Sequence, residues 1–364
     1  MSTIIKVIAF QGGQASRLAV KLALWISITL ACFGLVTGCM PDAPTANSTS
    51  RLDQVISRGR LRCGTNGELP GFSFLDPQGR YVGLDVDICR AIAAALFDNP
   101  DAVDYRSLNA KERFAVLQSG EIDILSRNTT VTLGRAFANG LDFAPVVFYD
   151  GQGIMVRQDS KISKLADLKG KTICTQVGTT TQINLADQLR QRNIPYQPLT
   201  FDDINTVFAS YETGRCQAVS ADKSALIVRR SRLSQPSAHI ILPETISKEP
   251  LAPAVLSGDS RWLKAISWII YTLFEAEDLG ISSTNLAQIQ AGQNELLQKF
   301  LRPSDALGDN AGLPPDFPTR IIKAVGNYAE IYQRHLGSNS QFQLARANNA
   351  LWKNGGLLYS PPFR

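Results

Sequence analysis

The sequence predicts an α/β fold built on open sheets, and three observations support this prediction. Apolar residues recur with helical spacing in segments such as 84–97. Short apolar runs, including "EIDILS" (121–126) and "KTICTQ" (171–176), alternate with these segments. Polar loops rich in Gly and Thr follow the runs. Helix, strand and polar loop in this order are typical of an open α/β sheet.

The first 38 residues have the pattern of a secretory signal peptide. They contain three basic residues and no acid, followed by an apolar run over 22–36. This run of about 15 residues is shorter than the ~20 that a membrane-spanning helix needs. A basic start, a short apolar core and small residues before a break are typical of a cleaved signal.

The end of this segment predicts a lipid anchor. "VTGC" (36–39) resembles the bacterial lipobox, which implies cleavage after Gly38 and a lipid on Cys39. The alternative is an ordinary cleaved signal with a cysteine there by chance. Residues 39–50 would then form a flexible tether. We expect a lipid-anchored protein in the periplasm or on the outer face of the cell membrane, with no other contact with the membrane.

Charge and length limit the function classes. The chain has 37 Lys and Arg and 32 Asp and Glu, and three basic residues leave with the signal. The mature charge is therefore near +2 (34 minus 32). This balance gives no basic patch that would favour nucleic acid. The remaining body of about 325 residues is long enough for two domains.

Four cysteines remain in the body, and an even number in an exported chain predicts disulfides. Of three possible pairings we favour Cys63–Cys89 and Cys174–Cys216, because each pair falls within one expected domain. A zinc site is the weaker alternative. There is no CxxC motif, and the two histidines, His239 and His335, lie far from all four cysteines in the sequence. We expect no metal and no cofactor.

The body divides into two α/β units followed by helices. In the first unit we expect a strand over 59–66, a turn-rich loop over 67–80, a helix over 84–97 with Asp85 as its N-cap, a helix over 110–120 and a strand over 121–126. In the second unit and beyond we expect a strand over 171–176, a helix within 177–193, a strand, loop and helix over 214–230, and helices over 261–281, 318–333 and 341–352.

Three polar loops follow the strands at the edge where an open α/β sheet binds ligands. They are "RNTTVTLGR" (127–135), "VGTTT" (177–181) and "ADKS" (221–224). Arg135 would clamp a carboxylate, the threonines at a helix N-terminus would hold its other side, and Asp222 would take an ammonium. Taken alone, each residue also has a purely structural explanation. Arg135 could be a surface charge, the threonines could cap a helix, and Asp222 could be the N-cap of helix 224–230.

The segments "GLDVDICRAIAAALF", "LQSGEIDILSRNTTVTLGR", "VGTTTQINLAD" and "GRCQAVSADKSAL" resemble the family 3 extracellular solute-binding proteins of polar amino acid ABC transporters. "FYDGQGIMVR", "ISKEPLAPAV" and the C-terminal segment from "RIIKAVGNYAEIY" onward resemble the general L-amino-acid-binding type of this family. The resemblance covers residues 51–364.

The resemblance implies a type II periplasmic-binding-protein fold, in which two lobes close on a ligand about two hinge crossings. Lobe 1 would comprise 51–147 and 253–364, and lobe 2 would comprise 152–247. The hinges would be 148–151 and 248–252.

The resemblance also assigns site residues. The carboxylate-clamping arginine falls on Arg135, and contacts before it fall on Thr130 and Asn128. The carboxylate site of lobe 2 and the ammonium-binding acid fall on Gly178, Thr179, Thr180 and Asp222. An aromatic that flanks the ligand falls on Phe72.

One position departs from the family pattern: Ala110 stands where many members have a second aromatic, which favours a permissive pocket. Arg127, Glu68 and Lys111 are further polar candidates near the ligand side chain, although each could equally be an exposed charge.

The predicted function is binding of free L-amino acids by lobe closure and delivery to the transmembrane subunits of an ABC permease, without catalysis. A periplasmic dehydratase-like enzyme on the same fold is the alternative, because fold does not fix function. That enzyme would need a general acid in the cleft, and no histidine is positioned for it. A sensor is the third class, and it would need a signalling module that this sequence lacks.

Overall fold

A computed structural model describes residues 50–303 and 312–363. The predicted signal, tether and lipidated Cys39 lie outside these residues. The elements described below all belong to one unit, Ser50–Arg364. No helix in the described part of the chain is long and apolar enough to cross a membrane.

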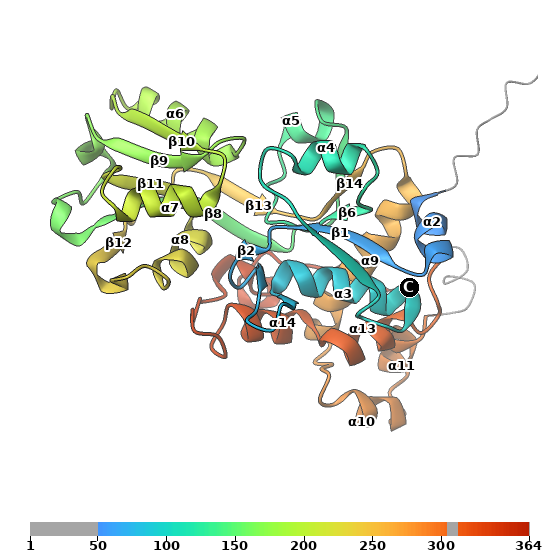
Figure 1. The fold of residues 1–364 in the computed structure, drawn as a ribbon. Coiled ribbons are helices and arrows are strands. Elements are labelled where there is room, and N and C mark those ends of the chain that lie inside the picture. Colours follow the sequence, from blue (N-terminus) through green and yellow to red (C-terminus); the bar gives the residue numbers. More distant parts are fainter. Residues whose placement is uncertain (1–49, 304–311, 364) are drawn as a thin grey trace, which may run out of the picture. The chain divides into compact units, whose positions relative to one another are not determined.

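The first sheet, which defines lobe 1, has the strand order β5-β1-β6-β14-β7 (Figure 1). Its strands are β1 (Leu61–Thr65), β5 (Val103–Ser107), β6 (Ile124–Leu125), β7 (Leu141–Phe143) and β14 (Ala254–Leu256). β1 runs parallel to β5 and β6, and β14 runs antiparallel to β6 and β7. The predicted disulfide Cys63–Cys89 is confirmed and ties β1 to helix α3 (Leu84–Phe97).

The second sheet, which defines lobe 2, has the order β10-β9-β11-β8-β12. Its strands are β8 (Phe148–Arg157), β9 (Thr172–Gln176), β10 (Gln197–Phe201), β11 (Ala218–Asp222) and β12 (His239–Ile241). β9 lies parallel to β10 and β11, whereas β8 runs antiparallel to β11. The pairing Cys174–Cys216 is also confirmed, and it joins β9 to the turn before β11.

The chain passes between the two sheets twice. The first passage is the start of β8, and the second is β13 (Lys248–Leu251), which leads into β14. The two passages pair antiparallel, with Lys248 opposite Gly151 and Leu251 opposite Phe148. Figure 1 shows β13 and β8 between the two groups of strands. These are the segments for which the sequence predicts hinges.

The predicted loop over 67–80 contains a small antiparallel sheet. It consists of β2 (Glu68–Leu69), β3 (Ser73–Leu75) and β4 (Tyr81–Val82). These strands could not be predicted from the sequence, because each has only two or three residues and turns surround them.

The prediction of Asp85 as the N-cap of α3 is wrong, since Gly83 occupies that position with φ +134°. A Cβ at Gly83 would lie 2.2 Å from the Phe72 carbonyl oxygen, so only glycine fits this close approach. Asp85 is buried in the first turn instead. Its Oδ2 accepts the backbone N–H of Asn128 at 3.0 Å.

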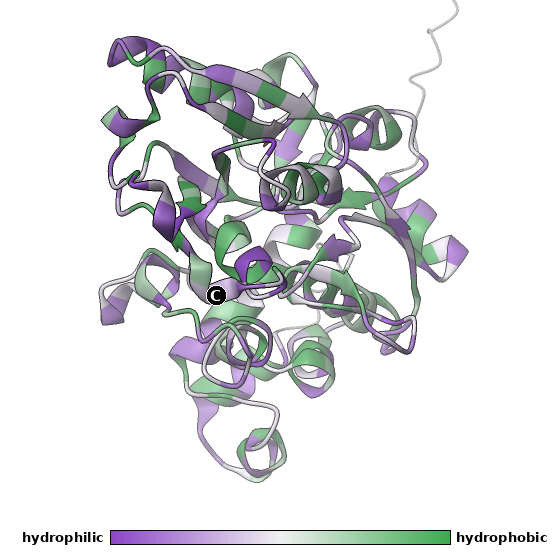
Figure 2. Cartoon of the chain, turned by 60° about the vertical axis from the view of Figure 1, so that its left-hand side comes forward, coloured by the Kyte–Doolittle hydropathy of each residue, from purple (hydrophilic) through white to green (hydrophobic). Residues whose placement is uncertain are grey.

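The remaining helices lie between and around the sheets. They are α2 (Arg51–Arg58), α4 (Arg113–Gln118), α5 (Leu133–Phe137), α6 (Thr180–Gln191), α7 (Ile204–Glu212), α8 (Lys223–Arg230), α9 (Ser260–Asp278), α10 (Leu286–Ala291), α11 (Glu295–Leu301), α13 (Phe317–Val325) and α14 (Tyr328–His335). Contacts of α3 with α9, α13 and α14 build the largest apolar cluster. Figure 2 shows hydrophobic colour on many strands and interior helix segments, and hydrophilic colour on turns and outlying loops.

Two predicted C-terminal helices differ from those observed. The helix over 318–333 is divided at Gly326, where φ is +81°, and Asn327 begins α14 with a capping box to Glu330. The helix over 341–352 is absent from the structure. That stretch holds a 3₁₀ turn at Ala347–Asn349, and both Gln343 and Ala347 have positive φ, which an α-helix excludes.

Candidate functional site

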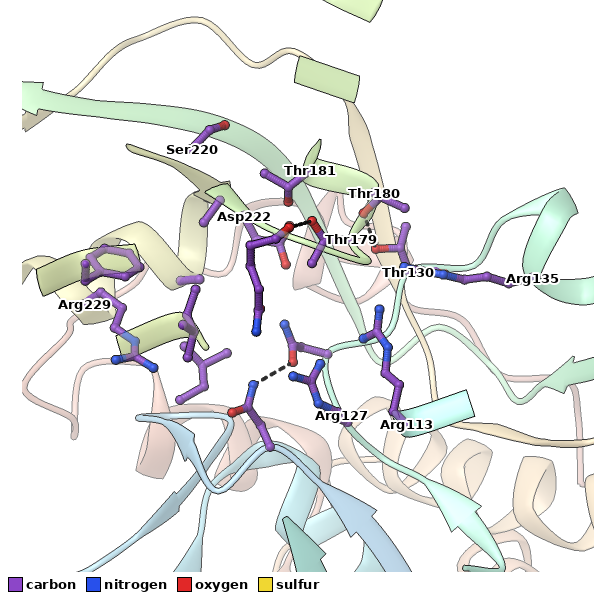
Figure 3. A pocket seen from close by; sticks show the side chains of 18 residues that line it. Arg113, Arg127, Thr130, Arg135, Thr179, Thr180, Thr181, Ser220, Asp222 and Arg229 are labelled. Carbon is purple, nitrogen blue, oxygen red and sulfur yellow. Dashed lines mark hydrogen bonds between the residues drawn. The ribbon is translucent and has the colours of Figure 1, made fainter. Parts of the chain in front are cut away.

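A polar cavity lies between the lobes, with an empty volume of about 600 Å³ that includes some open solvent. Six of the predicted site residues line it: Asn128, Thr130, Arg135, Thr179, Thr180 and Asp222. They come from the loop after β6, helix α5, the start of α6 and the end of β11. Figure 3 shows these side chains from both lobes around one space.

Asp222 faces the cavity because another carboxylate caps its helix. Asp222 occupies the N-cap position of α8 but makes no side-chain cap bond. Asp150 of β8 accepts the backbone N–H of Ser224 at 3.3 Å instead, and also its hydroxyl. The side chain of Asn128 lines the same cavity and favours the ionised form of Asp222, which opposes a rise in the pKa of that carboxyl. Burial, together with the charges of Asp150 and Glu249, raises the pKa of Asp222 well above its usual range.

Arg135 is not a surface charge. It lies in α5 with only 7% of its surface exposed. Its Nη1 donates to the backbone oxygen of Thr130 at 2.6 Å, and its guanidinium lies over the Phe114 ring. Its pKa is lowered by burial, which the charges of Glu249 and Asp222 partly oppose. The guanidinium is therefore buried and held in place beside the cavity.

The three threonines at the start of α6 have different contacts. Thr179 is the N-cap: its Oγ1 accepts from the Gln182 N–H at 3.2 Å and donates to the Gln176 oxygen at 2.7 Å. Thr180 donates its hydroxyl to Glu249 at 3.0 Å. Thr181 also lines the cavity. The N–H groups of Thr180 and Thr181 occupy the first helical positions, where no intrahelical acceptor exists.

Glu249 of β13 joins both lobes at the cavity. Its carboxylate accepts the Thr130 hydroxyl at 2.6 Å, the Thr180 hydroxyl at 3.0 Å and the Asn184 amide at 2.8 Å. The loop of Thr130 is held beside β13 because the Val131 N–H donates to the Pro250 oxygen at 2.8 Å. A carboxylate accepts only, so both threonine hydroxyls use their protons on Glu249. Their oxygens then offer lone pairs to other groups.

Two further arginines of lobe 1 face the same space. Arg127, a candidate from the sequence, lines the cavity and donates from Nε to the Leu108 oxygen at 2.7 Å. Arg113, which the sequence analysis missed, is the first residue of α4 and is 3% exposed. Figure 3 shows Arg113, Arg127 and Arg135 on one side of the cavity. The only sequence signal for Arg113 is a charge at a position of helix 110–120 where an amphipathic pattern puts an apolar residue.

Arg229 of α8 was also missed. Its Nη2 donates to the backbone oxygen of Glu68 in lobe 1 at 2.8 Å, and its Nη1 hydrogen-bonds to Asn205 of lobe 2. Glu68 itself lines an adjoining cavity that shares Asn66, Arg127, Gln176 and Ile204 with the first.

Three expected positions lie elsewhere. Phe72 does not line the cavity: it lies in the turn before β3, is 1% exposed and packs edge-on against Phe148 in the core. Gly178 lies beside the cavity wall, where an added Cβ would be 3.5 Å from the Ala110 oxygen. Lys111 is exposed and lies 4.0 Å from Asp202.

The sequence matches a protein family over most of its length. The family model of bacterial extracellular solute-binding proteins, family 3, matches residues 61–302. The chain is 45% identical to the general L-amino acid-binding periplasmic protein AapJ of Rhizobium johnstonii, over 88% of this chain and 94% of that protein. It is 41% identical to the glutamate/glutamine/aspartate/asparagine-binding protein BztA of Rhodobacter capsulatus, over 94% of this chain and 99% of that protein.

Solved structures agree with this match. A periplasmic binding protein of Brucella ovis with glutathione bound superposes with a TM-score of 0.84 at 43% identity, over 86% of this chain and 99% of that chain. The cysteine-binding protein of Campylobacter jejuni superposes with a TM-score of 0.57 at 26% identity, over 68% and 97%. The fold is therefore the two-lobe type II fold that the sequence predicts.

Proposed function

The chain belongs to family 3 of the bacterial extracellular solute-binding proteins, and we propose that it binds free L-amino acids between its lobes for an ABC importer. One observation carries this proposal: a buried arginine of lobe 1, Arg135, and a buried carboxyl of lobe 2, Asp222, line one cavity. These are the complements of an α-carboxylate and an α-ammonium. The relatives AapJ and BztA are named as amino-acid-binding proteins, which supports the same ligand class.

We propose a ligand pose that uses each contact once. Arg135 and the free N–H groups at the start of α6 take the α-carboxylate. Asp222 takes the α-ammonium, together with the Thr130 oxygen, whose proton is already donated to Glu249. Asn128 lines the same cavity and favours the ionised Asp222 carboxylate that this pose needs. This pose uses Thr130 as an acceptor.

Closure follows from the division of these groups between the lobes. Arg135, Thr130 and Asn128 belong to the lobe 1 segment, and Asp222 and Thr180 to lobe 2. A ligand that contacts both sets binds the closed arrangement more strongly and shifts the population toward it. The paired strands β8 and β13 would serve as the hinge. The closed protein would then deliver its ligand to the transmembrane permease.

We also propose that the protein acts at the membrane surface through a lipid on Cys39. Members of the family are extracellular or periplasmic. A lipid at the end of a short tether would raise the protein's concentration near the permease. Labelling with radioactive palmitate, in the natural protein and in Cys39→Ser, tests this anchor: incorporation that persists in Cys39→Ser would contradict it.

Thermal unfolding against the twenty L-amino acids, with D-isomers as controls, tests the ligand class. A ligand that binds only the folded protein raises the midpoint. We expect shifts with L- but not D-isomers. Turnover of an amino acid or a prephenate-like acid would instead favour the dehydratase-like alternative.

Arg135→Ala and Asp222→Ala test the site itself. Truncating one partner of a buried charge contact costs about 2–5 kcal/mol, so we expect each variant to weaken binding by at least about 30-fold. Titration calorimetry measures the loss, and circular dichroism checks that the variants fold. Unchanged affinity in both variants would refute the proposed pose.

A further inference from the structure

We propose that this cavity prefers amino acids that carry a second anionic group, held by Arg113 and Arg127. The inference rests on the proposed function and narrows its substrate class to acidic side chains. It rests on two buried arginines in the cavity wall, Arg113 and Arg127. Neither forms an ion pair within the described residues, and the proposed pose does not assign the α-carboxylate to them.

Arg113 is the principal observation. It is 3% exposed and lines the cavity. Its Nη1 lies 3.5 Å from the Thr129 hydroxyl, which is the longest distance that counts as a hydrogen bond. Its Nε has no hydrogen-bond partner, and no carboxylate within the described ranges forms an ion pair with it. A buried cation with so few partners is costly unless a ligand anion supplies them.

The neighbours of Arg113 add to this cost. The guanidiniums of Arg113 and Arg135 lie 4.7 and 5.3 Å from the centre of the same Phe114 ring. Burial and the charges of Arg127 and Arg135 lower the pKa of Arg113 well below its usual range. The carboxyl that opposes this effect is Asp222, which the proposed pose assigns to the ligand ammonium.

Arg127 supplies a second cation beside the same space. It is 4% exposed, and Nε is its donor to the protein, on the Leu108 oxygen. Asp85 and Glu68 favour its charge electrostatically, but neither forms an ion pair with it in the described chain. Arg127 also lines the adjoining cavity of Glu68, so the ligand side chain has room to extend past it.

Charge counting then selects the ligand. Four arginines line the cavity, Arg113, Arg127, Arg135 and Arg229, against one acid, Asp222. The α-carboxylate balances Arg135, and Arg229 is bonded to protein oxygens on two sides. Arg113 and Arg127 remain without an ion-pair partner among the described residues. A side-chain carboxylate would satisfy them with charge-assisted hydrogen bonds, whereas an amide would leave the charge uncompensated.

Isosteric ligand pairs provide a test that needs no variant. We expect the natural protein to bind L-glutamate at least about 10-fold more tightly than L-glutamine at pH 7.5, with the same order for L-aspartate over L-asparagine, by titration calorimetry. Equal affinity within a pair, or tighter binding of the amide, would overturn the inference and leave the proposed function intact. Failure of every L-amino acid to bind would instead defeat the proposed function.

Arg113→Met tests the residue. We expect it to reduce the glutamate-to-glutamine affinity ratio by at least about 10-fold while glutamine affinity changes by less than about threefold. Arg106→Met, an exposed arginine of lobe 1 that pairs with Glu121, is the matched control and should leave the ratio unchanged. The inference would be contradicted if Arg113→Met weakened the binding of glutamate and glutamine equally while the ligand-free variant unfolded like the natural protein. Arg113 would then not distinguish the two ligand side chains.

Discussion

Asp222 illustrates how a residue with an ordinary local role becomes available for a ligand. By sequence it is a good N-cap for the following helix, and by position it is the N-cap. Asp150, 72 positions earlier and on a different strand, takes the cap contact with Ser224 instead. Without that exchange the carboxyl would point at its own helix. A cap contact made by a residue so distant in the chain cannot be inferred from local sequence.

A proton-linkage prediction follows from the environment of Asp222. Asp150, Glu249, Asn128 and Arg135 surround it, and its pKa is raised. An ammonium beside Asp222 favours the ionised carboxylate and lowers that pKa, so binding releases a proton. We therefore expect amino acid affinity to rise as pH increases through the pKa of the free protein. Calorimetry in two buffers of different ionisation enthalpy measures the released protons.

Asp222→Asn is the control for this linkage, at ligand concentrations high enough to saturate the weakened site. It should remove most of the proton release, because the amide has no titrating proton. Net proton uptake by the natural protein on binding would show that a group other than Asp222 dominates the linkage.

At the level of elements, β13 is more than a connection between the lobes. Glu249 is 1% exposed and accepts hydrogen bonds from Thr130 on one side and from Thr180 and Asn184 on the other. Ser247 of the same segment donates to it as well. One carboxylate on this strand thus orders the ends of two segments that contribute the proposed carboxylate and ammonium contacts.

Glu249→Gln is expected to destabilise the unligated protein by about 1–3 kcal/mol, because an amide offers one acceptor and places an NH₂ against groups that donate. Urea unfolding without ligand measures the change. Glu295→Gln is the matched control: Glu295 is exposed at the start of α11, and its replacement should leave the urea midpoint unchanged. Stability equal to that of the natural protein would show that the donors find other partners.

Elements with a strong apolar period could be predicted from the sequence, whereas short strands defined only by pairing with neighbouring strands could not. α3, α6, α9 and β9 lie close to their predicted positions, since each has a clear apolar pattern. β2 to β4 are too short for any period, and Gly326 breaks a helix that continuous periodicity favoured. For the site, residues on loops after strands were found. Arg113 was missed because only tertiary contacts turn it into the cavity. Glu249 was missed because only tertiary contacts bring it to Thr130 and Thr180.

At the level of the whole molecule, contacts between the lobes set how readily the cavity closes. Thr130 to Thr180 and Arg229 to the Glu68 oxygen both cross between lobe 1 and lobe 2. The first contact involves groups of the proposed ligand site. Arg229 differs, because its bond to Asn205 holds it within lobe 2 while its bond to Glu68 reaches the other lobe. It can therefore stabilise closure without contacting the ligand's carboxylate or ammonium.

Arg229→Met separates closure from ligand recognition. Removing a charge-assisted contact between the lobes costs about 1.5–3 kcal/mol, so we expect affinity to fall at least about 10-fold through faster dissociation. The loss should be the same for L-glutamate and L-glutamine, because the partner is a protein oxygen. Stopped-flow displacement measures dissociation, and Arg230→Met on the same helix is the control. Unequal losses for the two ligands would place Arg229 in the ligand site and assign closure to the remaining contacts.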